Sequence, residues 1–304
     1  SEIILRPYQF CNLTEVVIRA KDKFDDLKRK VMLATILGTA QATLTKFPYL
    51  RKIWNTNTEE ERLLGVSLTG IMDNPLTNGK KHGLEKTLKA LREVAVETNK
   101  EWSAIFGIPQ SAAITCVKPS GTVSQLVDSS SGIHPRHSSY YIRTVRGDNK
   151  DPLTNFMVDS GIPSEADFMK PDTQTVFSFP MKSPKNSVMR NDMTAIEQLE
   201  MWLLYQRHWC EHKPSVTISV RDDEWMEVGA FVFKHFDEMS GVSFLPHSDH
   251  TYQQAPYQDC TEAVYNDFSS KFGHIDWNKF IDYEKEDNTN SSQTFACSGD
   301  SCEI

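Results

Sequence analysis

The chain has 304 residues, a formal net charge of −8, and 39% hydrophobic, 10% aromatic and 24% charged residues. No apolar run reaches the roughly 20 residues that a membrane-spanning helix needs, and the composition excludes collagen-like, coiled-coil and wholly disordered chains. The acidic balance argues against binding to nucleic acid through its phosphates. We therefore expect a globular protein with no membrane partner and no direct nucleic acid binding.

The N-terminus and the cysteines bear on localisation and metal content. The chain begins at Ser1 rather than Met and enters an apolar stretch at Ile3 without the basic region of a signal peptide. Six cysteines are too few for a disulfide scaffold at this length, and no Cys/His spacing typical of a zinc site occurs. Because nothing marks export, we expect a cytoplasmic protein with mostly free thiols and no metal.

Hydrophobic periodicity predicts alternating strands and helices. In chain order these are a strand at 12–19, a helix at 22–43, a strand at 64–72, a helix at 83–106, strands at 113–117 and 175–181, a helix opening at Thr194, a strand at 215–220 and a helix after Asp222. Thr194 and Glu197 have the spacing of a capping box. Strands separated by long helices imply βα units, and hence an α/β fold with five mainly parallel strands.

The C-terminal stretch differs from the rest of the chain. Residues 287–293 read DNTNSSQ, which is polar and without periodicity, so we expect one body over 1–286 and a flexible tail over 287–304. The tail carries Cys297 and Cys302, separated by four small or polar residues. A bridge between them would close too small a loop to stabilise much. Exposed thiols exchange readily, so we favour a redox-active pair over two incidental surface cysteines.

Two loops are candidate binding sites. Lys118 to Ser124 follows the predicted strand 113–117 and contains Gly and hydroxyl residues. Such a turn forms a phosphate cradle if it opens a helix, although an ordinary strand-to-helix turn has the same composition. The loop 129–137 contains His134, Arg136 and His137; these could bind an anion or a proton, but their spacing alone favours a polar surface loop. Glu2 and Cys11 flank an apolar run, which by itself means little.

Taken together, these segments resemble the catalytic chain of adenosylcobalamin-dependent (class II) ribonucleotide reductases, over essentially the whole chain. The carriers are Ser1 to Pro7 leading to Phe10-Cys11-Asn12-Leu13-Thr14-Glu15-Val16, then Arg62 to Val66, the Pro119–Ser124 turn, Gly132 to Arg136 with Tyr140 to Arg143, and the two-cysteine tail. In this family an Asn-Pro-Cys tripeptide immediately precedes the residue that matches Ser1. Its Cys carries the thiyl radical, and its Asn binds substrate.

The resemblance implies the C-terminal half of a ten-stranded α/β barrel, cut immediately after the radical cysteine. A Ser in the first position also suits the residue that follows a protein-splicing element. We therefore expect a split gene whose halves are joined by an intein; a non-covalent pair and an arbitrary boundary are the alternatives. A half-barrel leaves strand edges unpaired, so the chain is expected to need its N-terminal half as a partner.

The resemblance also implies a role for each site residue in replacing the ribose 2′-OH with hydrogen. Glu2 matches the general base for the 3′-hydroxyl, and burial is expected to raise its pKa. Cys11 matches one of two thiols that reduce the substrate, and Cys297 and Cys302 match the pair that thioredoxin-type proteins renew. The remaining implied positions are the substrate phosphate site, Pro119, Ser120, Gly121, Thr122 and Ser124, and the contacts to adenosylcobalamin, His134 and Arg136.

Two alternatives remain open. The large subunit of a di-iron (class I) reductase shares the barrel and the cysteines, but it needs a Tyr-Tyr pair late in the chain, and the adjacent tyrosines here are Tyr140 and Tyr141. The second alternative is a non-catalytic, phosphate-binding fragment. In either reading the chain is expected to be inactive without the N-terminal half.

Overall fold

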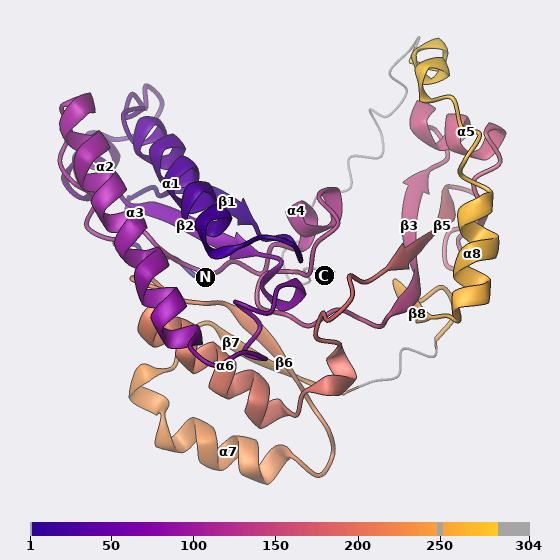
Figure 1. Ribbon diagram of the computed structural model, residues 1–304. Coiled ribbons are helices and arrows are strands. Elements are labelled where there is room, and N and C mark those ends of the chain that lie inside the picture. Colours follow the sequence, from indigo (N-terminus) through magenta and orange to yellow (C-terminus); the bar gives the residue numbers. More distant parts are fainter. Residues whose placement is uncertain (1, 248–251, 285–304) are drawn as a thin grey trace. The chain divides into compact units, whose positions relative to one another are not determined.

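The computed structural model describes residues 2–247 and 252–284, and its contacts divide the chain into two compact units (Figure 1). Unit 1 consists of Ser1–Arg136 and Pro184–His247, and unit 2 of His137–Ser183 and Ser248–Ile304. The predicted boundary at residue 287 and the predicted tail lie outside the described residues. Among the described residues, no helix is both long enough and apolar enough to cross a membrane.

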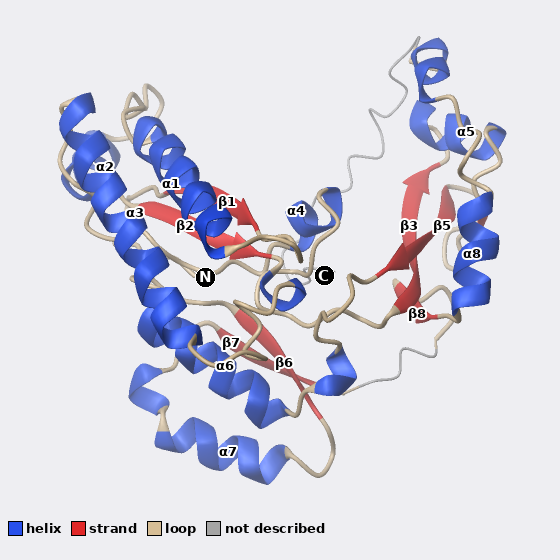
Figure 2. Cartoon of the chain, viewed as in Figure 1, coloured by secondary structure: helices blue, strands red, loops and turns tan. Residues whose placement is uncertain are grey.

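Parallel strand pairs form the centre of unit 1 (Figure 2). Strand β1 (Asn12–Val17) pairs with β2 (Leu64–Thr69), and β6 (Val216–Val220) pairs with β7 (Val242–Pro246). The predicted strand at 113–117 is reduced to isolated parallel bridges, from Thr115 to Val66 of β2 and from Val117 to Pro214. The three predicted strands at 12–19, 64–72 and 215–220 are thus confirmed with slightly shorter bounds.

Helices pack against these strands and enclose the main core of unit 1. They are α1 (Phe24–Gln41), α2 (Lys52–Glu61), α3 (Leu84–Phe106), α4 (Gly121–Leu126), α6 (Ala195–His208) and α7 (Trp225–Lys234), with 3-10 turns at Ile71–Asp73, Arg190–Asp192 and Phe236–Glu238. The four predicted helices correspond to α1, α3, α6 and α7. Helix α3 buries Leu84, Leu88, Leu91 and Ala95, as its periodicity predicts.

The start of α6 is fixed by its cap. Thr194 Oγ1 accepts from the Glu197 N–H at 3.2 Å, and the Glu197 carboxylate accepts from the Thr194 N–H at 2.7 Å. Two backbone donors that the first turn would leave unpaired are therefore satisfied. The helix then buries Trp202 and Tyr205 completely, each with its polar atom bonded to a backbone oxygen.

Unit 2 contains a four-stranded antiparallel sheet in the order β4-β5-β3-β8. The strands are β3 (Tyr140–Asp148), β4 (Ser164–Ala166), β5 (Gln174–Lys182) and β8 (Tyr257–Asp259), and the helical elements are α5 (Pro152–Asp159), α8 (Glu262–Ser270) and a 3-10 turn at Trp277–Asp282. A small core forms around Phe156, Met157, Ile162 and Phe177.

This sheet corrects the expectation that all five predicted strands run mainly parallel. The run 175–181 is a strand, but it lies in β5 and pairs antiparallel with β3, Tyr140 opposite Lys182. The sequence hides β3 because Arg143, Arg146 and Asp148 break its apolar pattern. The described residues do not form a barrel, so the ten-stranded barrel remains a prediction about a larger assembly.

Candidate active site

Glu2, the predicted proton acceptor, lies in unit 1 and is 9% exposed. The backbone N–H of Lys213 donates to the Glu2 carbonyl at 3.0 Å, and the N–H of Ile4 donates to His212 Nδ1 at 3.3 Å. The segment that follows α6 therefore holds the backbone around Glu2 in place. The Glu2 carboxylate itself forms an ion pair with the ammonium group of Lys118.

The charge state of Glu2 differs from the expectation. Burial is the largest single effect and would raise the pKa of Glu2, but the hydrogen bond from Lys118, a backbone hydrogen bond and nearby positive charges together hold the pKa below its usual value. At neutral pH Glu2 is therefore an ionised carboxylate with a bound cation. Such a carboxylate is well placed but a weak base, since a low pKa means little affinity for a proton.

Lys118 connects Glu2 to a second carboxylate. The Lys118 backbone N–H donates to Ser67 Oγ at 2.9 Å, and Ser67 Oγ donates to Glu15 Oε1 at 3.0 Å. Ser67 is fully buried in β2, and Glu15 lies across from it in the parallel register of β1. The β1–β2 pair therefore places Glu15 beside Ser67, and Ser67 links it to Lys118, whose ammonium group pairs with Glu2.

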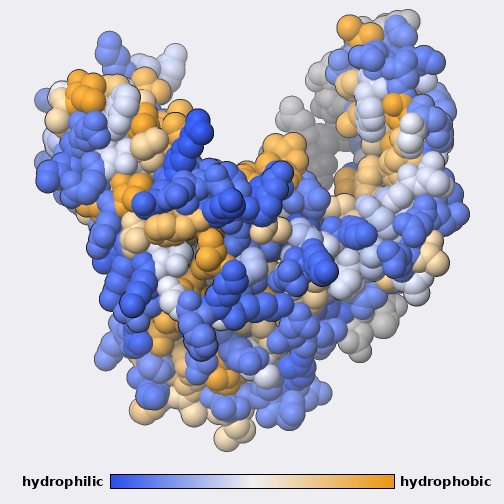
Figure 3. Space-filling model, in the orientation of Figure 1, coloured by the Kyte–Doolittle hydropathy of each residue, from blue (hydrophilic) through white to orange (hydrophobic). Residues whose placement is uncertain are grey.

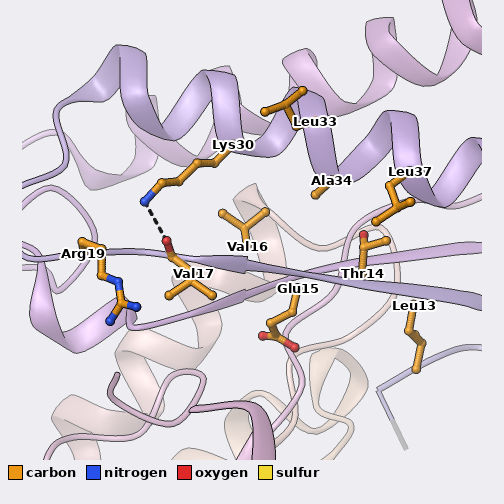
Figure 4. Close-up of a pocket in the computed structure, with 10 residues that line it drawn as sticks. All are labelled: Leu13, Thr14, Glu15, Val16, Val17, Arg19, Lys30, Leu33, Ala34 and Leu37. Carbon is orange, nitrogen blue, oxygen red and sulfur yellow. Dashed lines mark hydrogen bonds between the residues drawn. The ribbon is translucent and has the colours of Figure 1, made fainter. Parts of the chain in front are cut away.

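Glu15 is a candidate site residue that the sequence analysis did not single out. Burial raises its pKa to about 7, against the lowering effects of Ser67, Lys118 and Ser120. Figure 4 shows Glu15 on the opposite side of β1 from Thr14 and Val16. A signal was present, because a lone acidic residue inside the apolar strand Asn12–Val17 is unusual without a partner or a function.

Cys11 directly precedes β1 and approaches the same cluster. Burial raises the pKa of its thiol to about 12, against the lowering effect of Lys118 and with a contribution from Glu2. The thiol is therefore protonated at neutral pH. Gly65 makes room for the neighbouring Leu13 and Ile3 side chains, since a Cβ at that position would lie 2.3 Å from Leu13 and 2.9 Å from Ile3.

The predicted phosphate turn does open a helix, because Ser120 is the residue before α4. Ser120 has a positive φ of 58°, a strained conformation for a residue with a side chain. Ser120 is 8% exposed and lies near enough to Glu15 to lower the pKa of Glu15. Its Oγ nevertheless makes no hydrogen bond of good geometry with any described atom. Gly121 and Thr122 are exposed, whereas Ser124 is buried and donates to the Gly121 carbonyl at 3.3 Å.

The two predicted cofactor residues are engaged within unit 1. The His134 ring accepts from the Thr217 N–H through Nε2 at 3.0 Å and donates from Nδ1 to the Ser131 carbonyl at 2.8 Å, and burial lowers its pKa. Arg136 makes a bidentate pair with Asp73, both bonds at 2.9 Å, and a further bond to Asp128. These contacts give both residues a structural role, and their contact with a cofactor stays a prediction.

Of the remaining five cysteines, Cys260 is half-buried and burial raises the pKa of its thiol, and the other four divide into two groups. Cys116 and Cys210 are buried, as expected, and burial raises the pKa of both thiols well above the usual range. Cys297 and Cys302 lie outside the described residues. Within residues 2–247 and 252–284, no group of three or more His, Cys, Asp or Glu side chains is arranged to hold a metal ion.

A pocket of about 450 Å³ lies between β1 and α1 (Figure 4). Its lining includes Leu33 and Leu37 of α1, which are largely exposed, and Lys30, which donates to the Val17 carbonyl at 2.8 Å. Among the described strands β1 pairs with β2 alone, so its other edge borders this pocket. Figure 3 shows apolar residues reaching the visible surface in places between polar ones.

Comparison with known proteins finds sequence similarity to reductases. The chain is 29% identical over 285 residues to a probable adenosylcobalamin-dependent ribonucleoside-triphosphate reductase of Dictyostelium discoideum, covering 91% of this chain and 36% of the relative. Two further relatives are adenosylcobalamin-dependent ribonucleoside-triphosphate reductases. The one from Euglena gracilis is 27% identical and covers 86% of this chain and 36% of the relative. The one from Lactobacillus gasseri is 28% identical and covers 96% of this chain and 42% of the relative. No family model matches the chain.

Solved structures agree at the level of the fold. The crystal structure of a B12-dependent (class II) ribonucleotide reductase matches with a TM-score of 0.79 and 24% identity, over 94% of this chain and 43% of that one. The alpha subunit of the class Id reductase of Actinobacillus ureae matches with a TM-score of 0.50 and 12% identity. The chain is a distant homologue of adenosylcobalamin-dependent class II reductases and spans between about a third and two fifths of their length.

Proposed function

We propose that this distant homologue of class II ribonucleotide reductases supplies one part of a reductase active site, which replaces the 2′-OH of a ribonucleotide with hydrogen. The observation that carries the proposal is the convergence of Glu2 and Cys11 on Lys118, directly before the turn that holds the unpaired Ser120 hydroxyl. A base, a reducing thiol and a phosphate site are the three functions that the reaction needs from these residues.

Glu2 is proposed to accept the proton of the 3′-hydroxyl while the 2′-OH leaves as water. Its backbone is fixed by Lys213, and the carboxylate is buried, so water competes little for the proton. Cys11 is proposed as one of two thiols that reduce the substrate. Overall, one ribonucleotide and two thiols give one deoxyribonucleotide, one water molecule and one disulfide, which balances the electrons and protons.

The high pKa of Cys11 suits this role. A thiol with a pKa of about 12 keeps its hydrogen at neutral pH and is available as a hydrogen donor to a substrate radical, whereas a thiolate is not. The second thiol is proposed to come from the N-terminal half of the reductase, which is also proposed to carry the radical cysteine. The two halves are proposed to be joined by an intein, with non-covalent association as the alternative.

The turn from Pro119 to Ser124 is proposed to bind the substrate phosphate. Support comes from the buried Ser120 hydroxyl, which lies near Glu15 but makes no hydrogen bond of good geometry, because a poorly paired buried donor is costly unless a ligand satisfies it. The exposed Gly121 and Thr122 leave backbone and hydroxyl groups accessible beside it.

Adenosylcobalamin is proposed as the cofactor because the curated relatives depend on it. When bound, it would supply the radical that starts the reaction. The fit to this chain is limited, since the ring nitrogens of His134 and the guanidinium of Arg136 are already used in internal contacts. Contact of these two residues with the cofactor therefore stays a prediction, and we derive no step through it.

Two partners complete the proposal. The unpaired edge of β1 and the apolar pocket beside α1 would accept strands of the N-terminal half, because exposed strand edges readily pair with further strands. A thioredoxin-type protein would renew Cys297 and Cys302, which in turn would reduce the disulfide at Cys11. Cys297→Ser should leave a single turnover intact and stop multiple turnovers that use thioredoxin.

The test is reconstitution with the N-terminal half, by mixing or by ligation, followed by measurement of deoxynucleotide formation with and without adenosylcobalamin. Formation that requires the cofactor supports the proposal. Turnover that ignores cobalamin and needs a small subunit would select the class I reading. No deoxynucleotide under any condition would leave a non-catalytic phosphate-binding fragment.

A further inference from the structure

A continuous line of contacts runs from the phosphate turn to Glu2. Ser120 of the turn lies near Glu15, Glu15 accepts from Ser67, and Ser67 accepts from the backbone of Lys118. The Lys118 ammonium then pairs with Glu2. Lys118 is also the residue directly before Pro119, so the cation that neutralises Glu2 is carried by the residue that leads into the turn.

We propose that Lys118 is a positioning residue shared between Glu2 and the substrate phosphate, so that phosphate binding at the turn frees the Glu2 carboxylate to accept a proton. The inference rests on the proposed function and deepens it, since it adds a control by substrate over the same site. Without phosphate, Lys118 keeps Glu2 as a paired carboxylate. With phosphate, the ammonium moves to the anion.

The chemistry of lysine permits this exchange. Its ammonium is a point charge on a flexible four-carbon stem, with three donors that rotate freely, and the Lys118 side chain is 28% exposed, which leaves it room to move. A phosphate group carries more negative charge than one carboxylate and therefore competes well for the ammonium. The paired state matches the lowered pKa of Glu2, for which Lys118 is the main lowering cause.

Phosphate binding changes the electrostatics at Glu2 in one direction. Glu2 loses a nearby positive charge and gains a nearby negative charge, and both changes favour the protonated carboxyl. The base strength of Glu2 should therefore rise when substrate is in place. A base whose pKa approaches the working pH is also the more efficient catalyst.

Other titratable groups face Glu2 and must be separated from it in a titration. Those that interact with it electrostatically are the N-terminal amino group, Lys118, Glu15, Cys11, Cys116 and His212. Burial keeps both thiols protonated and lowers the pKa of His212, so these three are uncharged near neutral pH. Glu15 is the second carboxyl of the cluster, with a pKa raised to about 7, and Glu15→Gln removes its contribution.

The test is a carbon-13 NMR titration of the glutamate side-chain carboxyls in the full chain, with Glu2 assigned by Glu2→Gln and with inorganic pyrophosphate as the probe. The titration is done with Glu15→Gln as the background. We expect saturating pyrophosphate to raise the titration midpoint of Glu2 by about one pH unit, the usual effect of exchanging a neighbouring charge. Binding itself is followed by the heat of titration.

Variants of Lys118 separate coupling from structure. Lys118→Met should raise the Glu2 midpoint without pyrophosphate and leave a smaller further shift on its addition, whereas Lys118→Arg should retain the coupled shift. Lys213→Met is the matched control. This variant removes a positive charge from the residue whose backbone holds Glu2. Its Glu2 midpoint and the shift caused by pyrophosphate should be the same as in the protein that retains Lys118 and Lys213.

Two results would overturn the inference. In the first, pyrophosphate binds but the titration midpoint of Glu2 does not change. In the second, pyrophosphate does not bind at millimolar concentration. Neither result depends on turnover. A reconstituted protein that makes no deoxynucleotide while the shift is observed would refute the reductase function and leave the coupling intact, whereas an active enzyme without the shift would refute only the coupling.

Discussion

Replacing Glu15 with Gln tests the charge cluster through protein stability. The pKa of Glu15 rises from 4.5 to about 7 in the folded chain, and burial is the main cause. Between these values the unfolded chain loses its proton while the folded chain keeps it, so folding becomes less favourable as pH rises. The stabilisation is fully present below the unfolded pKa and is lost as pH rises through the folded pKa.

The magnitude follows from the size of the shift. One pKa unit corresponds to about 1.4 kcal/mol, so the whole effect is about 3 kcal/mol, of which about 2.5 kcal/mol falls between pH 5 and pH 8. Gln has nearly the same shape as Glu and does not titrate. We therefore expect the loss of stability from pH 5 to pH 8 to be smaller by about 2.5 kcal/mol in Glu15→Gln than in the original chain.

Urea unfolding followed by tryptophan fluorescence measures this difference. Trp202 and Trp209 are fully buried in unit 1, the unit that contains Glu15, so their emission reports the relevant transition. Glu93→Gln is the control, because Glu93 is exposed on α3, and it should leave the pH dependence unchanged. Parallel pH profiles for the original chain and Glu15→Gln would refute the assignment of a buried, proton-holding Glu15.

Three further predictions concern the core, the turn and the thiol. Arg136→Met leaves the Asp73 carboxylate, whose side chain is 3% exposed, without its cationic partner. The variant should lower the free energy of unfolding by about 3–5 kcal/mol in a urea titration, and a loss under about 1 kcal/mol would contradict the buried pair. Ser120→Ala should weaken pyrophosphate binding several-fold in a calorimetric titration without loss of folding, and unchanged affinity would remove Ser120 from the phosphate site. In the reconstituted enzyme, Cys11→Ser should abolish deoxynucleotide formation even with a dithiol reductant, and normal turnover would show that another thiol reduces the substrate.

Local patterns were sufficient for much of unit 1. Helix α3 was predictable because Leu84, Leu88, Leu91 and Ala95 recur on one face, and α6 was predictable because Thr194 and Glu197 form a complete capping box. In both elements each residue that determines the structure is within about two turns of the next one.

Unit 2 was not predictable in the same way. Strand β3 carries Arg143 and Arg146, whose partners Tyr257 and Asp167 are distant in the sequence. Its pairing with β5 is antiparallel, and strand direction depends on the path of the chain rather than on the composition of either strand. The division into two units likewise follows from long-range contacts, which hydrophobic periodicity does not report.

The candidate site shows the same limit. Glu2, Cys11 and the Pro119–Ser124 turn were found through resemblance to a family, whereas the residues that link them were not. Lys118 and Glu15 matter because the fold places them beside Glu2 and Ser67. The direction of the Glu2 pKa also depended on Lys118, which lies 116 residues away in the sequence.

The central claim is that Cys11 reduces a ribonucleotide within a site formed partly by this chain. The most direct measurement is a single turnover of the reconstituted enzyme without external reductant, in which deoxynucleotide and the disulfides that contain Cys11 are both quantified by mass spectrometry. The account predicts one Cys11 disulfide for each deoxynucleotide formed. Deoxynucleotide that forms while Cys11 remains a free thiol would contradict it.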